Sequence, residues 1–398
     1  MRLFLPLILL VCVSPVASSQ AKSDGTLSLD DRVFVASQVY SLLQSNSKAP
    51  DFENLYKDYL QRVLASDDRR QFDLATMEFV AKHQSGHTFF LDAWLDNLPL
   101  DFCAIPLEEK WVVTASVHES LKPGEVMTDV NEATVEAFFL RHRRYISASS
   151  AAAQRRNLFL YPYLFPQHFT LTLEDGREVA IDRAASRRIA ARTEGRWVET
   201  NRVAVIKIPT FLDPTSESTA LDYVRRFHRA QILIVDLKNN SGGIPPQRLI
   251  RAMMNQPFRG WSEVCLTYQN CPETPQKPRS GGSAKPDPSA FRGRVILLVD
   301  GGCVSACEDF VEPFKETGRG TLVGETTQGS SGVPFVYDFH NGMTLRIAVK
   351  RNYFSDGTEF EGIGIKPDIE VHATIEDLKK GRDPVLQKAL ELAEYPLR

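Results

Sequence analysis

One serine stands where a buried strand should give way to a helix. The run RVILLV at 294–299 is typical of a buried strand, and DGGCVSACEDF follows it at 300–310. A hydroxyl at such a corner lies beside free helix N–H groups, which can stabilise the oxyanion formed when a serine attacks a carbonyl carbon. Ser305 is therefore a candidate nucleophile. The same residues also fit a capping box, with Ser305 as N-cap and Glu308 as its supporting acid, so this stretch alone leaves both interpretations open.

A second strand ends in a turn that could assist the same reaction. ILIVDLKNNSGG at 232–243 runs from a buried strand into an amide-rich turn that closes on Gly242 and Gly243. Glycine lets the backbone approach a ligand closely, so the N–H of either residue could join that of Ala306 as an oxyanion donor. An ordinary loop between a strand and a helix is the alternative.

Two histidines, His83 and His87, stand four residues apart, as zinc ligands on a helix can. The segment HQSGH lacks the glutamate of the metalloprotease motif, and Gly86 suggests that the helix ends before His87. The spacing therefore gives little support to a metal site. We expect no metal and no organic cofactor.

Three kinds of element must position these residues. Residues 27–84 carry helical apolar spacing in three segments, FVASQVYSLLQ, FENLYKDYLQRVL and FDLATMEFVAKH. Short strands and turns follow from 111 to 184, including the hairpin-like FTLTLEDGREVAI with Asp175 and Gly176 at its turn. From Arg202 onward apolar strands alternate with helices, which indicates a parallel sheet covered on both faces. We therefore predict an α/β fold with a helical N-terminal cap, a small β-rich module and an α/β core.

Composition narrows the class of protein. With 398 residues, 43% of them hydrophobic and 24% charged, the chain can bury a large core. The net charge is −3, with 47 basic and 50 acidic residues. Because such a balance offers no basic surface for a polyanion, we expect no nucleic-acid partner.

The first 19 residues have the character of a secretory signal. They carry one basic residue, an apolar stretch from Leu3 to Val13, and the small residues Ala17 and Ser19 before Gln20. A membrane anchor is the alternative, but the apolar run is shorter than the ~20 residues that a span needs. We expect a secreted or periplasmic protein without stable membrane insertion after cleavage.

Five cysteines remain when Cys12 is removed with the signal, and an odd number cannot all pair within one chain. Cys265 and Cys271 flank a short segment and could form a local bridge in an oxidising compartment. Free buried thiols are the alternative.

Six motifs, in order along nearly the whole chain, resemble the tail-specific or C-terminal processing serine peptidases, including the core domains of tricorn protease. They are QSGHTFF at 84–90, IKIPTF at 206–211, VDLKNNSGG at 235–243, VILLVDGGCVSACEDF at 295–310, LVGETTQGSSG at 322–332 and FEGIGIKPDIEV at 360–371. The resemblance implies a ClpP/crotonase-like core in which Ser305 is the nucleophile.

The resemblance also bears on the general base. In the bacterial processing branch a lysine follows the glycine of the segment that here reads ETTQGSSG, whereas this chain has Ser330 at that position. The chain is more similar to the tricorn-core branch, which uses histidine and glutamate, and the matching residues are His87 and Glu361. The resemblance implies that His87 takes the proton of Ser305 and that Glu361 orients the imidazole. With an unperturbed imidazole, activity would fall as the pH drops through ~6.5.

How Glu361 connects to His87 is open in the sequence. In the tricorn core a serine directly precedes the histidine and relays it to the glutamate, and here that residue is Gly86. Glu361 could act directly, through Ser85 or Ser330, or through water.

We predict four regions: a signal peptide at 1–19, a helical domain at 27–100, a PDZ-like β-rich module at 101–200 and a serine peptidase core at 201–398. LKPGEVMTDVNEATV at 121–135 resembles a PDZ-like domain, which in this family binds substrate tails by strand addition. The interruption RRYISASSAAAQRRNLFLYPYLF makes the module atypical.

The function that we expect is that of a secreted serine endopeptidase, which cleaves peptide or protein substrates through an acyl-enzyme. A non-catalytic ligand- or peptide-binding protein on the same scaffold and an exported esterase are the alternatives. The sequence leaves the oligomeric state open.

Overall fold

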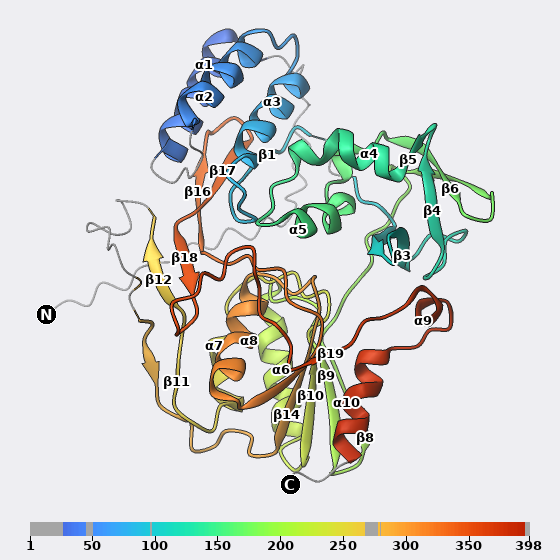
Figure 1. The fold of residues 1–398 in the computed structure, drawn as a ribbon, viewed down its shortest axis with the longest axis vertical. Helices are drawn as coiled ribbons and strands as arrows, with labels where there is room; N and C mark the ends of the chain where they lie inside the picture. The colour runs from blue at the N-terminus through green and yellow to red at the C-terminus, as the bar shows by residue number, and fades with distance from the viewer. Residues whose placement is uncertain (1–26, 45–50, 96–97, 267–277, 279, 395–398) are drawn as a thin grey trace, which may run out of the picture.

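The computed structural model describes residues 27–44, 51–95, 98–266, 278 and 280–394. The predicted signal peptide and Cys271 lie outside these residues. Figure 1 shows three helices at one end of the molecule, the β-rich module beside them, and a large sheet with its helices at the other end. None of the helices in the described ranges combines the length and the apolar character that a bilayer span requires.

Three helices form where the apolar spacing predicts them: α1 Leu29–Gln44, α2 Phe52–Leu64 and α3 Arg69–Ala81. Helix α3 begins after Asp68, whose side chain accepts a hydrogen bond from the N–H of Gln71. Aromatic rings join α2 to α3, with Tyr59 and Phe79 stacked 4.6 Å apart. The end of α3 fixes where the segment carrying His87 begins.

The β-rich module is an antiparallel sheet of order β2-β3-β4-β6-β7, with β5 beside β4. The predicted hairpin is confirmed, because β6 pairs with β7 and Gly176 takes a φ of 84° at the turn. The strands are β2 Phe102–Leu107, β3 Lys110–Ser116, β4 Val126–Val130, β5 Ala133–Thr134, β6 His168–Leu173 and β7 Glu178–Asp182.

A helical segment separates β5 from β6, and it includes the stretch that interrupts the PDZ-like pattern. It consists of α4 Val135–His142, η1 Arg143–Tyr145, α5 Ala151–Arg156, η2 Leu158–Leu160 and η3 Pro162–Leu164. Thr134 and Ser150 cap α4 and α5 by accepting hydrogen bonds from Ala137 N–H and Ala153 N–H. We call residues 143–165 the inserted segment.

The second half of the chain is built on a six-stranded sheet of order β19-β15-β14-β10-β9-β8. Five strands run parallel, as the apolar runs predict, while β8 pairs antiparallel at the edge, which the sequence did not indicate. The strands are β8 Glu194–Glu199, β9 Val203–Lys207, β10 Ile232–Asp236, β14 Arg294–Val299, β15 Gly320–Gly324 and β19 Ile369–Glu370.

Helices cover both faces of this sheet because successive strand residues point to opposite sides. In β14, Leu297 packs in the cluster that contains residues of the helices α6 Pro214–Arg226, α7 Gln247–Met253 and α8 Ala306–Thr317. The next residue, Leu298, packs in the cluster of α10 Pro384–Glu394. Helix α6 begins at Pro214, directly after Asp213, whose side chain caps it by accepting a hydrogen bond from Thr215 N–H.

The smaller elements lie around this core: β11 Phe258–Arg259 pairs with β13 Ser283–Ala284, and β12 Ser262–Cys265 pairs with β18 Lys350–Tyr353. Helix α9 is Ile375–Lys379.

A third sheet joins the two ends of the chain. Strand β1 Phe89–Asp92 pairs antiparallel with β17 Met343–Ala348, which also pairs with β16 Pro334–Asp338. Leu345 of β17 belongs to the same core as the helices α1 to α3. The packing therefore assigns the β16-β17 hairpin to the N-terminal part of the molecule, although it falls within the predicted core region 201–398.

A buried acidic pair beneath this sheet leads to a prediction about stability. Asp73 is fully buried and faces Asp92, whose carboxylate accepts two hydrogen bonds from Arg69, at 2.6 and 2.8 Å. Burial and the neighbouring Asp92 raise the pKa of Asp73 to about 9. The folded state thus binds a proton that the unfolded state releases near its ordinary pKa, so stability falls as the pH rises between these two values.

Asp73→Asn should remove this pH dependence, because the amide carries no charge. The free energy of unfolding of the wild type should therefore fall with pH relative to that of the variant. We expect the difference, variant minus wild type, to increase by up to about 1.4 kcal/mol per pH unit above pH 6. Urea unfolding at pH 6 and pH 8.5 measures the difference, with the exposed Asp222→Asn as a control. A constant gap between Asp73→Asn and wild type at the two pH values would contradict the assignment.

Candidate active site

Ser305 stands directly before helix α8 in a strained backbone conformation. Its φ and ψ are 59° and −122°, which a residue with a side chain rarely adopts. The turn after β10 presses against it, since a Cβ on Gly242 would lie 2.5 Å from the Val304 carbonyl oxygen and 2.7 Å from Ser305 Cβ. Strain at a strand-to-helix corner is typical of a nucleophile that must present its hydroxyl to a substrate.

His87 meets Ser305 across 218 residues of sequence. Its Nε2 lies 2.9 Å from Ser305 Oγ, within hydrogen-bond distance for proton transfer. The following Thr88 accepts a hydrogen bond from Ala348 N–H on β17, so the third sheet holds this segment in place. Burial, assisted by the positive charge of Arg346, lowers the pKa of His87 to about 4. The pKa of an unperturbed imidazole therefore does not apply to His87, and its ring is neutral near pH 7.

A pair of serines connects the other side of His87 to Glu361. Nδ1 of His87 lies 3.0 Å from Ser330 Oγ, and Ser330 donates a hydrogen bond of 3.4 Å to Glu361 Oε1. Ser149 also donates to Glu361 and lies 3.0 Å from Ser330 Oγ. Burial raises the pKa of Glu361 to about 7 although three donors oppose the shift, with Ser149 the largest of them.

Ser85, the other expected connection, points elsewhere. Its hydroxyl accepts a hydrogen bond of 3.3 Å from the backbone N–H of His87. The residue between Ser85 and His87 is Gly86, and a larger residue would clash there, because a Cβ would lie 2.5 Å from Ser330 Oγ. Of the two serines, Ser330 and not Ser85 lies within hydrogen-bond distance of the His87 ring.

Sequence reasoning missed Ser149. It belongs to the inserted segment, which matched no motif, yet it also accepts a hydrogen bond of 2.9 Å from Gly86 N–H. No local pattern marks a serine of this kind, because its partners lie 63, 181 and 212 residues away.

Glu308 organises the loops beneath the site. Its fully buried carboxylate accepts hydrogen bonds from Ser305 N–H, Ser330 N–H, Gly329 N–H and the Thr327 hydroxyl, at 3.1, 3.0, 2.6 and 2.6 Å. Burial raises its pKa to about 8, and these four donors oppose the rise. The capping acid predicted from the sequence thus fixes both the candidate nucleophile and the serine behind His87.

The candidate oxyanion donors are the backbone N–H groups of Gly242, Gly243 and Ala306. The N–H of Gly242 donates a hydrogen bond to Asn240 Oδ1 at 2.9 Å. Gly243 has a φ of 136°, and the residues on either side of it bond to Phe211: Phe211 N–H donates to Gly242 O, and Ile244 N–H donates to Phe211 O. The hydrogen bonds of the described residues engage neither the N–H of Gly243 nor that of Ala306, the first residue of α8, so these two remain as candidate donors.

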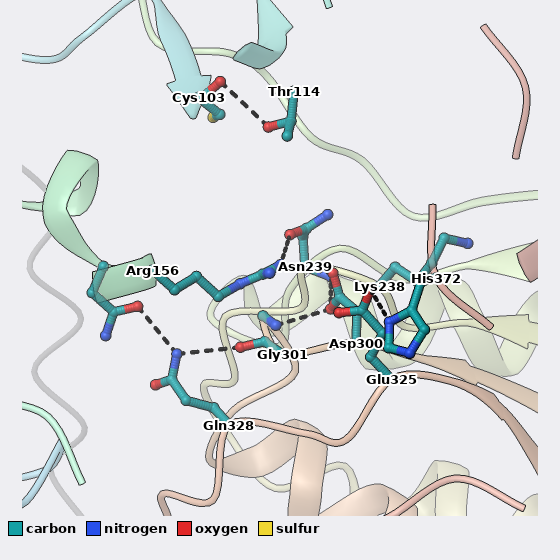
Figure 2. A network of polar contacts seen from close by, with 12 residues as sticks. Cys103, Thr114, Arg156, Lys238, Asn239, Asp300, Gly301, Glu325, Gln328 and His372 are labelled. Atoms are coloured by element: carbon teal, nitrogen blue, oxygen red, sulfur yellow. Dashed lines mark hydrogen bonds and ion pairs between the residues drawn. The ribbon is translucent and has the colours of Figure 1, made fainter. Parts of the chain in front are cut away.

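Arg156, the last residue of α5 in the inserted segment, reaches the turns that follow β10 and β14 (Figure 2). Arg156 donates hydrogen bonds to Asp300 Oδ2 at 2.8 Å and to Asn239 Oδ1 at 2.9 Å. Asp300 Oδ1 accepts from Asn239 N–H at 2.8 Å and from Gly302 N–H at 3.0 Å. Because only 15% and 13% of the Arg156 and Asp300 side chains are exposed, the ion pair is weakly screened. It ties together the turns after β10 and β14.

A disulfide between Cys303 and Cys307 encloses Ser305, and both cysteines are fully buried. The sequence left the pairing of these two cysteines open. Cys103 is an exposed free thiol. Cys265 is disulfide-bonded, but its expected partner Cys271 lies outside the described residues.

The serine connection can be tested by substitution. Ser330→Ala removes the link between His87 and Glu361, so we expect kcat to fall by about 10- to 100-fold, typical for partners that orient a reacting group, with KM unchanged. Ser85→Ala is the matched control, because the Ser85 hydroxyl bonds to the backbone N–H of His87 and not to its ring, and it should keep kcat within about twofold. A larger loss in Ser85→Ala than in Ser330→Ala would overturn the connection.

Residues 202–371 match the family model described as peptidase family S41. This part of the chain is similar to peptidase family S41. The chain is 28% identical over 170 residues to the tricorn protease of Thermoplasma acidophilum, a match that covers 42% of the chain and 14% of that protein. It is 27% identical over 175 residues to the carboxy-terminal processing protease CtpA of Bacillus subtilis, covering 43% of the chain and 35% of CtpA. The chain thus aligns with well under half of either relative.

Solved structures extend the likeness in fold beyond the matched residues. Mature CPAF complexed with lactacystin has a TM-score of 0.71 and 15% identity, over 92% of this chain and 98% of CPAF. The photosystem II D1 C-terminal processing protease has a TM-score of 0.55 and 18% identity, over 87% and 94% of the two chains. At such identities the likeness concerns the fold alone, so the roles of the site residues are argued from their own geometry.

Proposed function

We propose that this chain is an exported serine endopeptidase that cleaves peptide bonds through an acyl-enzyme, with Ser305 as nucleophile. The observation that carries the proposal is the contact of 2.9 Å between Ser305 Oγ and His87 Nε2, at a corner whose backbone is strained. A serine hydroxyl is a weak nucleophile until a neighbouring base takes its proton. The neutral His87 is such a base.

In the proposed reaction His87 removes the Ser305 proton as Oγ attacks the carbonyl carbon of the substrate. The oxyanion of the tetrahedral intermediate accepts hydrogen bonds from Ala306 N–H and Gly243 N–H. His87 then returns the proton to the leaving amine, and a water molecule repeats the sequence on the acyl-enzyme. No step requires a metal or an organic cofactor.

Glu361 acts through Ser330 in this proposal. When His87 gains a proton at Nε2, Nδ1 donates to the Ser330 hydroxyl, which donates in turn to Glu361. An ionised Glu361 offsets the imidazolium charge, and the relay fixes the orientation of the ring. Ser149 holds Glu361 and Ser330 together.

Export is supported by two features. The N-terminal sequence has the charge, apolar and small-residue pattern of a secretory signal. The disulfide between Cys303 and Cys307 would persist in an oxidising compartment and not in a reducing cytosol. We therefore propose a secreted or periplasmic location.

Labelling with a fluorophosphonate probe tests the function. The probe reacts with a serine only when a neighbouring base activates it, so we expect mass spectrometry to find the label on Ser305 and none in a His87→Ala variant. No labelling of a folded protein would count against the peptidase and favour a non-catalytic binding protein on this scaffold.

The dependence of activity on pH should report Glu361. Its pKa is raised to about 7 and that of His87 is lowered to about 4, so the charge on Glu361 appears as the pH rises through 7 while His87 is already neutral. We expect kcat/KM to rise through pH 7, and Glu361→Gln to lose this inflection. Rates between pH 4 and 9 measure both profiles. Profiles of the same shape in the two proteins would exclude Glu361 from the mechanism.

A further inference from the structure

A pocket of about 300 Å³ opens beside the site, between α3, β1 and the inserted segment. Its walls are mostly aromatic and aliphatic, with Met77, Phe89, Tyr145, Leu160, Tyr161 and Tyr163 among the lining residues. The lining, all of it in the described part of the chain, includes no charged side chain. Leu160 is 69% exposed, so it stands at the rim.

Two residues of the pocket wall are neighbours of the reacting groups. Gly86 precedes His87, whose imidazole contacts Ser305. Gln328 donates its backbone N–H to Cys303 O at 3.0 Å, two residues before Ser305, and its side chain donates to Asn157 Oδ1 at 3.1 Å. A peptide bond placed at Ser305 therefore has a neighbouring side chain within reach of this pocket.

The wall formed by the inserted segment is held rigidly against the site. Tyr161 donates its hydroxyl hydrogen bond to Ser147 O at 3.1 Å, and Arg70 donates to Tyr163 O at 3.0 Å. Earlier in the segment, Arg156 is bound to Asp300. Because the walls of such a pocket are already ordered, little of the binding free energy is lost to ordering them when a ligand enters.

We propose that this pocket receives a large apolar or aromatic side chain of the peptide substrate, next to the bond that is cleaved. The inference rests on the proposed peptidase function and adds the substrate class. The volume admits a side chain of the size of leucine or phenylalanine, and burying such a group in an uncharged pocket favours binding. An aspartate at the same substrate position would lose its hydration without gaining a partner.

The test uses internally quenched peptides that differ at one residue, with phenylalanine, leucine, alanine or aspartate placed in turn at each of three positions on either side of the scissile bond. We expect one position adjacent to the bond to prefer phenylalanine or leucine over aspartate by about 10- to 100-fold in kcat/KM. A preference below about twofold at every position would overturn the inference.

Two matched variants assign the preference to the pocket. Leu160→Asp places a charge at the rim and should reduce the preference about tenfold. Leu140→Asp changes a leucine of α4 that is 51% exposed and outside the pocket lining, and it should leave the preference unchanged. Equal effects of the two variants, or none from Leu160→Asp, would overturn the inference.

Binding separates this inference from the proposed function. Ser305→Ala protein cannot form an acyl-enzyme, so fluorescence anisotropy with labelled forms of the same peptides reports the pocket without catalysis. If the wild type neither cleaves peptides nor takes the fluorophosphonate label, the peptidase proposal fails while these affinities still decide the pocket. If it cleaves all the peptides alike and the affinities do not differ, only the pocket fails.

Discussion

Ser305→Ala should lower kcat by about a millionfold, which would leave only the slow residual rate that substrate binding and oxyanion donors can provide. The reason is chemical, since no other hydroxyl lies at Nε2 of His87 among the contacts of the described residues. The free energy of unfolding should change by only about 1 kcal/mol, the value of a helix cap. Burst kinetics and urea unfolding of the purified variant measure the two effects separately.

A second N-cap provides the control for this substitution. The exposed Thr374 begins α9 in a capping box with Asp377, and its hydroxyl donates to the Asp377 carboxylate. Thr374→Ala should cost a similar ~1 kcal/mol of stability and leave kcat unchanged. If Ser305→Ala kept its activity, Ser305 would be only a cap and the nucleophile assignment would be wrong.

His87→Ala should lower kcat by about 10⁴- to 10⁶-fold, because Ser305 would then have to lose its proton to water. KM should change little, since the imidazole acts on the nucleophile and not on the bound peptide in the ground state. Stopped-flow and steady-state assays with one peptide substrate measure both constants. Fluorophosphonate labelling should decline in parallel.

His83 offers a matched control on the same segment. Burial lowers its pKa to about 4, as it does for His87, but its ring packs edge-on against Phe52 at 5.5 Å. His83→Ala should therefore destabilise the fold while the folded protein keeps its kcat. Similar losses of kcat in the two histidine variants would show that the loss reports folding and not proton transfer.

The sequence by itself determined the types of element and the candidate residues. Apolar runs such as ILIV and VILLV predict buried parallel strands, because a strand covered on both faces is apolar along most of its length. The corner at Ser305 could also be predicted, since a strand end, glycines and a capping acid are local signals. The resemblance to the processing peptidases added His87 and Glu361.

Tertiary structure decided how these residues meet. Pairing of β1 with β17 brings His87 to Ser305, and no local signal encodes a pairing between strands some 250 residues apart. The choice of Ser330 over Ser85, the arrival of Ser149 and the disulfide around Ser305 likewise depend on contacts between distant segments. The inserted segment shows the limit most clearly, because its sequence marks only an interruption. Its position over the site follows from packing and from the Arg156 ion pair.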